Sequence, residues 1–299
     1  MIQNKAPGKD VSDEDIKEKI PKVSKDNPNH FSSFDISGVT FGPNQCPIFA
    51  GPNMVESNDL IEDVASNIKQ IGASFLRGGA FKPLTFPYRS KKYTETRLDG
   101  LKWLSSAKEK YSIPVITEVM ESKYLKEICK VADILQIGTR NMQNYPLLID
   151  SAQTGLPIML KRGYGASLRD WLGAAEYILN EGNNKVILCE RGITTAHTHK
   201  SSSRFLLDLQ VVPAAKEITH LPVVTDPSHA TFWRPWVLPM TLASLGAGAD
   251  GIMLEVHPNP SEAAVDPLQA IDYKSFSELM EKGKKVSEVL GYKKFGNIS

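Results

Sequence analysis

Short apolar runs alternate with longer amphipathic segments along most of the chain, from Cys46 onward. Each run is nearly continuous in apolar character and rich in β-branched residues, as expected of parallel strands that are buried on both faces. The eight runs begin at residues 46, 74, 114, 134, 157, 186, 222 and 251. The amphipathic segments between them predict helices, most clearly over residues 58–72, 96–111, 168–182 and 275–291. Glycine closes several of these segments, which is typical of helix C-termini.

Eight buried strands joined by helices predict an α/β fold of the (β/α)8 TIM-barrel type. The alternative is an open doubly wound sheet, which usually carries a GxGxxG phosphate-binding turn after its first strand. The first strand of this chain is instead followed by GPNMVES. The barrel is therefore the favoured architecture.

The segment before the barrel has a different character. Residues 1–33 are polar, and we expect a short, flexible or lightly docked N-terminal arm with one short helix over 12–20. Two β-prone runs flank Ser37-Gly38, which predicts a hairpin over 34–41 that closes the N-terminal mouth of the barrel. The expected organisation is this arm followed by a single catalytic domain, 34–299, that includes the hairpin.

Composition narrows the class of protein. The 299 residues carry 35 Lys and Arg against 34 Asp and Glu, a net charge of +1 that argues against a nucleic-acid partner. No apolar run reaches the roughly 18 residues of a membrane span, so no membrane partner is expected. The charged N-terminus lacks the apolar region of a secretory signal. The three cysteines, Cys46, Cys129 and Cys189, are too few for a disulfide framework, and a cytoplasmic location is expected.

Charged residues follow all eight predicted strands, where a barrel of this type places its active site. Five of them are the cations Arg77, Lys82, Arg140, Lys161 and Arg191. Cations that converge on one mouth repel one another unless an anion neutralises them, so we expect a small, multiply charged ligand such as a phosphate ester with a carboxylate. The alternative is that each is the ion-pair partner of a neighbouring strand end.

Acidic residues and one histidine share the same strand ends. The acids are Glu118, Asp226, Glu255 and Asp266. His229, Glu255 and Asp266 together offer nitrogen and oxygen ligands for a divalent metal ion. The alternative for His229 is a purely structural role.

At these residues the chain resembles a known family. Its motifs occur in the order GPNMVES, RGGAFKP, PVITEVM, ILQIGTRNMQNYPLL, IMLKRG, VILCERGI, THLPVVTDPSHAT and GADGIMLEVHPNP. This pattern is similar to that of compact 3-deoxy-D-arabino-heptulosonate 7-phosphate (DAHP) synthases, close to 3-deoxy-octulosonate 8-phosphate synthases. The resemblance implies a (β/α)8 barrel, which agrees with the strand count.

The resemblance also implies a transferase reaction. Phosphoenolpyruvate condenses with an aldose phosphate, erythrose 4-phosphate in the DAHP branch, to give DAHP and phosphate at the first step of the shikimate pathway to aromatic amino acids. Relatives are often dimers or tetramers, so a homo-oligomer is expected.

The family's functional residues carry over by position. The residues that would hold the substrates are Arg77, Lys82, Arg140, Lys161, Arg191 and Thr85. The implied catalytic residues are Lys82 as proton donor, Glu118, His229 and Asn53. The implied metal ligands are His229, Glu255 and Asp266.

Two departures from the family pattern concern the metal and the acceptor. Asn53 stands where relatives read GPCSVES, and a neutral amide is a weaker ligand than a thiolate, so a metal-independent reaction is favoured over one that uses Mn²⁺ or a similar ion. KPLTFPY replaces KPRTSPY, so Leu84 stands where an arginine would bind the acceptor phosphate; Thr85 remains, and Arg89, Lys91 or Lys92 is the alternative phosphate ligand. Bulky Phe232 and Trp233 either narrow the acceptor pocket or pack their loop. A different aldose acceptor, or a non-catalytic barrel that binds phosphoenolpyruvate, is the alternative.

Overall fold

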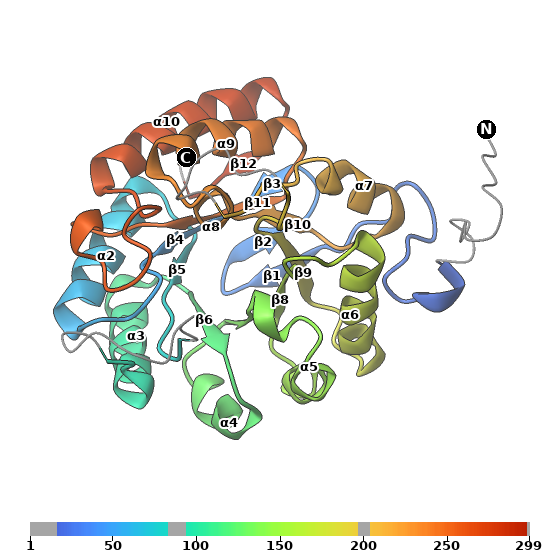
Figure 1. The fold of residues 1–299 in the computed structure, drawn as a ribbon, viewed down its shortest axis with the longest axis horizontal. Coiled ribbons are helices and arrows are strands. Elements are labelled where there is room, and N and C mark those ends of the chain that lie inside the picture. The colour runs from blue at the N-terminus through green and yellow to red at the C-terminus, as the bar shows by residue number, and fades with distance from the viewer. Residues whose placement is uncertain (1–16, 83–93, 197–203, 298–299) are drawn as a thin grey trace.

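Eight parallel strands form a closed barrel, as the alternating pattern predicts (Figure 1). The computed structural model describes residues 17–82, 94–196 and 204–297. The barrel strands are β4 (Ile48–Gly51), β5 (Phe75–Arg77), β6 (Val115–Val119), β7 (Ile134–Ile137), β8 (Ile158–Lys161), β9 (Val186–Glu190), β10 (Val223–Thr225) and β11 (Gly251–Glu255). Strands β11 and β4 pair and close the barrel, with Met253 opposite Phe49.

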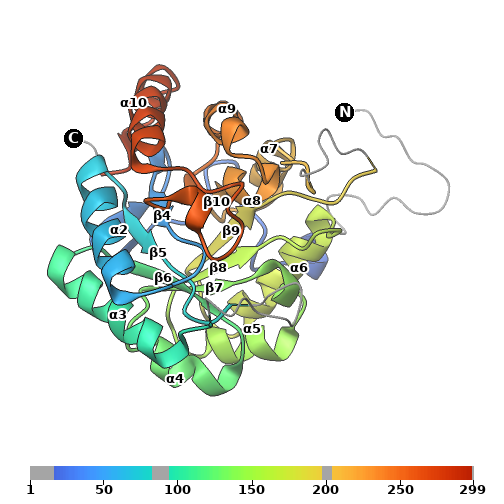
Figure 2. The same cartoon turned by 60° about the vertical axis from the view of Figure 1, so that its left-hand side comes forward.

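Helices cover the outside of the barrel (Figure 2). They are α2 (Asn58–Ile71), α3 (Arg97–Tyr111), α4 (Leu125–Ile128), α5 (Tyr145–Ala152), α6 (Leu168–Asn180), α7 (Val211–Ile218), α8 (Pro227–Thr231), α9 (Arg234–Gly246) and α10 (Tyr273–Val289). Single 3₁₀ turns occur at Ser122–Tyr124, Thr139–Asn141 and Pro260–Glu262. The four helices expected from amphipathic segments are confirmed as α2, α3, α6 and α10. None of the helices in the described ranges is long and apolar enough to cross a bilayer.

Helix α2 shows why these segments fold as they do. The Ser57 side chain accepts a hydrogen bond from the backbone N–H of Leu60 and so caps the first turn. Gly72 ends the helix with φ of 111°, a left-handed conformation that costs glycine no side-chain strain. Ile61, Val64 and Ile68 form the face that packs against the barrel.

The barrel interior is built in layers, because every second residue of a strand points inward. A lower, apolar layer contains one inward residue from each strand: Phe49, Phe75, Ile116, Ile134, Met159, Ile187, Val224 and Met253. Two residues further along six of these strands come Arg77, Glu118, Gln136, Lys161, Asp226 and Glu255, all buried. The strand periodicity therefore places a ring of polar side chains directly above the apolar layer, at the C-terminal mouth.

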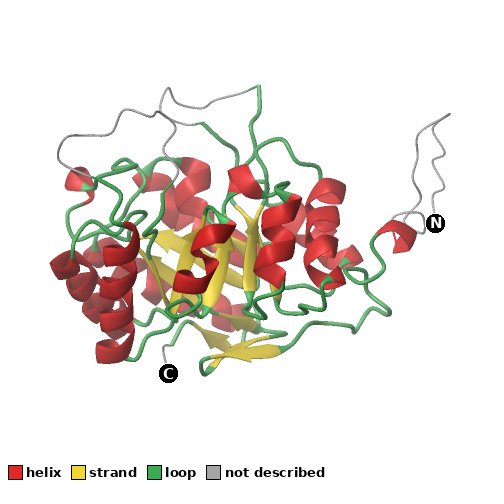
Figure 3. Cartoon of the chain, turned by 90° about the horizontal axis from the view of Figure 1, so that it is seen from below, coloured by secondary structure: helices red, strands yellow, loops and turns green. Residues whose placement is uncertain are grey.

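A hairpin closes the opposite end of the barrel, as predicted (Figure 3). Its strands are β1 (Phe34–Ile36) and β2 (Val39–Phe41), and both turn residues between them have positive φ. Phe41 is fully buried, with its ring 6.1 Å from that of Phe49 and 6.0 Å from that of Phe75. A second small pair, β3 (Gln45–Cys46) and β12 (Lys294–Phe295), lies beside it.

The described part of the N-terminal arm packs closely against the barrel. Only residues 17–19 of the predicted 12–20 helix are helical within the described ranges. Val23 is fully buried, its backbone N–H donates to Glu176 of α6, and Ser24 pairs with Thr219 after α7. Two apolar side chains, Ile20 and Val23, therefore dock a segment whose composition is otherwise polar.

Candidate active site

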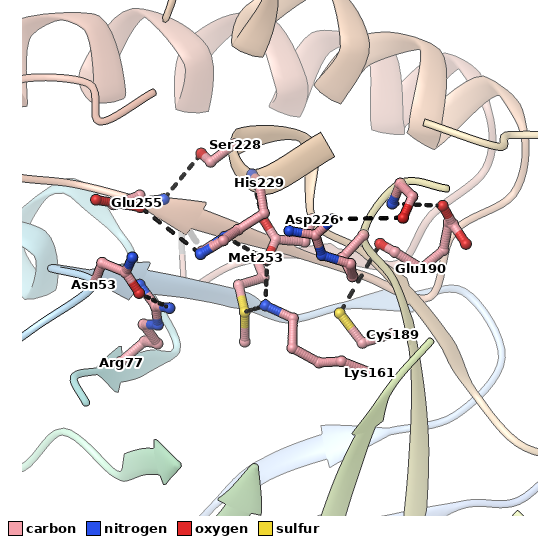
Figure 4. Close-up of polar contacts among 12 residues, drawn as sticks. Asn53, Arg77, Lys161, Cys189, Glu190, Asp226, Ser228, His229, Met253 and Glu255 are labelled. Atoms are coloured by element: carbon pink, nitrogen blue, oxygen red, sulfur yellow. Dashed lines mark hydrogen bonds and ion pairs between the residues drawn. The ribbon is translucent and has the colours of Figure 1, made fainter. Parts of the chain in front are cut away.

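The polar ring at the C-terminal mouth is held together by buried charge pairs (Figure 4). Lys161, the last residue of β8, donates to Asp226 across a distance of 2.6 Å. The same carboxylate oxygen lies 2.8 Å from His229 Nδ1, and its partner oxygen accepts the backbone N–H of His229. One carboxylate thus orients both the ammonium group of Lys161 and the imidazole of His229.

These contacts determine the protonation states in this group. Burial alone would raise the pKa of Asp226, but its contacts with His229 and Lys161 outweigh burial and hold the pKa well below its usual value. Burial, together with the nearby Lys161 and Arg77 charges, lowers the pKa of His229 well below its usual value. His229 is therefore neutral at pH 7. Nδ1 of His229 faces Asp226, and its Nε2 lies 4.0 Å from Glu255.

Asn53 connects a buried arginine to an acidic residue. Arg77 Nη2 donates to Asn53 Oδ1 across 2.6 Å, and Asn53 Nδ2 donates to Asp266 across 2.8 Å. A guanidinium group can only donate, so the amide oxygen must face Arg77 and the amide nitrogen must face Asp266. The other terminal nitrogen of Arg77, Nη1, is buried without a hydrogen-bond partner among the described residues. It is a donor available to an anionic ligand.

Lys82 lies beside the ring, just after β5. Its ammonium group is 3.2 Å from Glu118, and its backbone N–H donates to Glu95. Burial lowers the pKa of Lys82, Glu118 opposes that shift, and the charges of Arg77 and Lys161 add to it. Gly138 packs against the same carboxylate so closely that a Cβ atom there would lie 2.0 Å from Glu118 Oε1.

Aromatic rings hold two further cations, of which Arg191 is buried and Arg204 is exposed. The rings of Tyr164 and Phe205 stack with centroids 4.9 Å apart, and the Arg191 guanidinium lies 4.2 Å from the Phe205 centroid. Arg204 lies 3.8 Å from the ring centroid of Phe232. Stacking fixes a guanidinium without neutralising it, so its charge remains available to a ligand.

These groups open into a cavity of about 120 Å³ at the mouth. Its lining includes the four cations Lys82, Arg140, Arg191 and Arg204. Asp266 is the one carboxylate among the described residues that line it. The electrostatic balance of this small cavity favours an anion that carries more than one charge.

Three ligand groups for a divalent metal ion also meet here. Ligand atoms of His229, Glu255 and Asp266 all lie within 4.8 Å of one another. Burial and the charge of Asp266 raise the pKa of Glu255 to about 8, so a cation bound between the two carboxylates would be stabilised. The neutral Nε2 of His229 suits a metal ligand, but Asn53 presents an N–H to Asp266 and its oxygen to Arg77. The three-residue set fits a metal ion, and Asn53 does not complete it.

The structure brings most of the predicted site residues together, but at different depths. Arg77, Lys161 and Arg191 are nearly inaccessible to solvent, whereas Arg140 is exposed at the mouth. The alternative of ion pairs between strand ends holds, within the described ranges, for two of the five cations, because Lys82 pairs with Glu118 and Lys161 with Asp226. Both lysines nevertheless belong to the polar ring at the mouth or lie beside it. Thr85 lies outside the described residues.

Sequence reasoning missed several residues of the site. Tyr164, Phe205 and Arg204 line the cavity but belong to loops whose path no periodicity determines. Phe232 also lines it, whereas Trp233, one residue later, is not among the lining residues. The one sequence signal was for Tyr164, which follows three residues after Lys161 at the end of β8.

Comparison with known proteins identifies the family. The pattern of the DAHP synthetase I family matches residues 22–291. A phospho-2-dehydro-3-deoxyheptonate aldolase of Thermotoga maritima is 39% identical over 271 residues, which cover 91% of this chain and 78% of the relative. A 2-dehydro-3-deoxyphosphooctonate aldolase of Fusobacterium nucleatum is 29% identical over 282 residues, 88% of this chain and 98% of the relative.

Solved structures agree with the sequence matches. The crystal structure of the Thermotoga maritima DAHP synthase superposes with a TM-score of 0.85 at 38% identity, covering 91% of this chain and 78% of that one. A truncated form of the Thermotoga maritima enzyme superposes with a TM-score of 0.83 at 36% identity, covering 92% of this chain and 99% of that one. The chain is an enzyme that belongs to the DAHP synthetase I family.

Proposed function

We propose that this enzyme condenses phosphoenolpyruvate with erythrose 4-phosphate to give DAHP and inorganic phosphate, the first step of the shikimate pathway. Condensation of phosphoenolpyruvate with an aldose phosphate is the activity that its family membership supports. The observation that carries the proposal is the small cavity whose described lining residues include four cations and one carboxylate, because both substrates are anions.

The buried cations suit phosphoenolpyruvate. Arg77 offers the unpaired Nη1 donor, and Arg191 is held by aromatic rings, with no carboxylate within ion-pair distance among the described residues. We assign Arg77, Lys82, Lys161 and Arg191 to the carboxylate and phosphate of phosphoenolpyruvate, with Arg140 at the exposed edge. Fixed donors in a buried site stabilise charge strongly because they need no reorganisation.

The reaction requires a proton at the acceptor. C3 of phosphoenolpyruvate attacks the aldehyde carbon, and the aldehyde oxygen becomes an alkoxide that must be protonated. Water then adds to C2, and phosphate leaves with cleavage of the C–O bond. Lys82 is suited to donate the proton, because its lowered pKa brings it nearer to neutral and Glu118 holds its ammonium group in place. We assign Glu118 and His229 to orienting Lys82 and water.

A divalent metal ion is optional in this proposal. His229, Glu255 and Asp266 would hold it, and when bound it would supply positive charge to polarise the aldehyde oxygen. Asn53 already places an N–H group against Asp266 and fixes Arg77, which supports a metal-independent reaction.

A different aldose acceptor is the second candidate. Leu84 replaces the arginine of the family pattern, and Phe232 occupies space in the mouth cavity. We also propose that the enzyme forms a homo-oligomer and that it functions without a nucleic-acid partner.

The test is release of inorganic phosphate from phosphoenolpyruvate with four- and five-carbon aldose phosphates. We expect release with erythrose 4-phosphate and little with arabinose 5-phosphate. The reverse preference would assign the chain to octulosonate chemistry, and no release with any sugar, despite binding of phosphoenolpyruvate, would indicate a non-catalytic barrel.

A further inference from the structure

Arg204 has a position that sets it apart from the other cations of the mouth. Its guanidinium lies over the ring of Phe232, 3.8 Å from the centroid, and 3.5 Å from Asp266 Oδ1. Its side chain is 46% exposed, whereas those of Arg77 and Lys161 are almost fully buried. Arg204 thus lies on the outer rim of the cavity that Lys82 and Arg191 also line.

The backbone on both sides of this contact is well anchored. Leu206, two residues after Arg204, exchanges two backbone hydrogen bonds with Ile193, which follows β9 closely. Phe232 ends α8, the helix that carries His229, and has a left-handed φ of 51°. A phenylalanine in that conformation is strained, so its backbone is held there by its surroundings. The ring of Phe232 thus lies against Arg204 from a backbone position that its surroundings maintain.

The Arg204 contacts leave it able to bind a further anion. Asp266 at 3.5 Å is a long, partly exposed ion pair of the kind that contributes little to stability. A planar guanidinium stacked on a ring keeps its N–H edge directed outward, and this edge matches two oxygens of a phosphate. The family pattern has an arginine for the acceptor phosphate at the position of Leu84, which cannot bind one.

We infer that Arg204, positioned by Phe232, binds the phosphate of the aldose acceptor and so selects phosphorylated aldehydes. This inference rests on the proposed function. The acceptor phosphate replaces Asp266 Oδ1 as the partner of Arg204, while Asp266 Oδ2 keeps its hydrogen bond from Asn53. The acceptor aldehyde reaches inward to Lys82, while its phosphate stays at the rim.

The test compares Arg204→Gln, Arg204→Lys and Phe232→Leu with a matched control, Arg169→Gln. Arg169 is an exposed arginine of α6 outside the mouth cavity, so its substitution changes the net charge equally. Phosphate release gives KM for the aldose phosphate that the unaltered enzyme uses best, and isothermal titration gives the dissociation constant of phosphoenolpyruvate.

Loss of a charge-assisted hydrogen bond predicts that Arg204→Gln raises the acceptor KM about 10- to 100-fold. We expect a smaller rise for Arg204→Lys and Phe232→Leu, no change for Arg169→Gln, and unchanged affinity for phosphoenolpyruvate in all four. An acceptor KM within twofold of the unaltered enzyme, or a parallel loss of phosphoenolpyruvate affinity, would overturn the assignment of Arg204. If the unaltered enzyme condenses no aldose phosphate, the proposed function itself fails.

Discussion

Asn53 offers the sharpest test of how this site works without a complete set of metal ligands. Replacing it by alanine removes two hydrogen bonds, one to Arg77 at 2.6 Å and one to Asp266 at 2.8 Å. A buried hydrogen bond to a charged group contributes about 1.5–3 kcal/mol, which corresponds to roughly a 10- to 150-fold loss of kcat/KM if it acts in the transition state. We expect Asn53→Ala to fall in this range.

Replacing Asn53 by cysteine removes the same hydrogen bonds but adds a ligand. A thiolate beside His229, Glu255 and Asp266 would complete a four-residue set for a transition metal ion. In EDTA, Asn53→Cys should therefore be as impaired as Asn53→Ala. On addition of Mn²⁺, Asn53→Cys should recover and Asn53→Ala should not.

The assay is phosphate release from phosphoenolpyruvate with the acceptor present, measured in EDTA and after titration with Mn²⁺. Elemental analysis of the dialysed proteins gives the bound metal. The unaltered enzyme should keep its rate in EDTA. Complete loss of that rate, restored by Mn²⁺, would refute the metal-independent proposal, and an equal response of the Cys and Ala variants would refute the placement of Asn53 at the metal.

Three further predictions test the buried charges. Burial and the charge of Asp266 raise the pKa of Glu255 from 4.5 to about 8. Between these two pH values the native state binds more protons than the unfolded state, so the free energy of unfolding falls as the pH rises. Urea unfolding in EDTA at pH 5 and pH 9 should show a smaller fall in this free energy for Glu255→Gln than for the unaltered enzyme. Lys161→Met leaves Asp226 without its ammonium partner and should destabilise the fold by about 3–5 kcal/mol. The double variant Lys161→Met/Asp226→Asn should recover part of this stability in thermal unfolding. Equal instability of the single and double variants would contradict the pairing. Gly138→Ala would place a Cβ 2.0 Å from Glu118 Oε1 and displace the carboxylate that holds Lys82, so kcat should fall; an unchanged kcat would show that the position of this carboxylate is not critical.

The barrel could be predicted because its strands and helices differ in hydrophobic period. Buried parallel strands are apolar on both faces, and this signal is strong in β6 and β9. The positions of Arg77 and Lys161 in the mouth follow from the same period, since each comes two residues after an inward apolar residue, Phe75 or Met159. Strand periodicity thus fixes both the fold and the inner half of the candidate site.

The outer half of the site could not be predicted in the same way. Arg204 and Tyr164 reach the mouth through irregular loops, and their positions depend on contacts with Phe232 and Phe205 that no local pattern encodes. The depth of each cation is also a tertiary property, which explains why exposed Arg140 and buried Arg191 look alike in the sequence. The docking of the arm rests on only a few buried side chains, such as Val23, within a polar segment.

The hairpin that closes the N-terminal end of the barrel affects how ligands reach the candidate site. Phe41 closes the far end of the barrel, so among the described residues a ligand approaches the polar ring from the mouth cavity, which Arg204 and Phe232 line. A sugar phosphate seated at the rim of this cavity would block the way inward. We therefore expect phosphoenolpyruvate to bind before the acceptor.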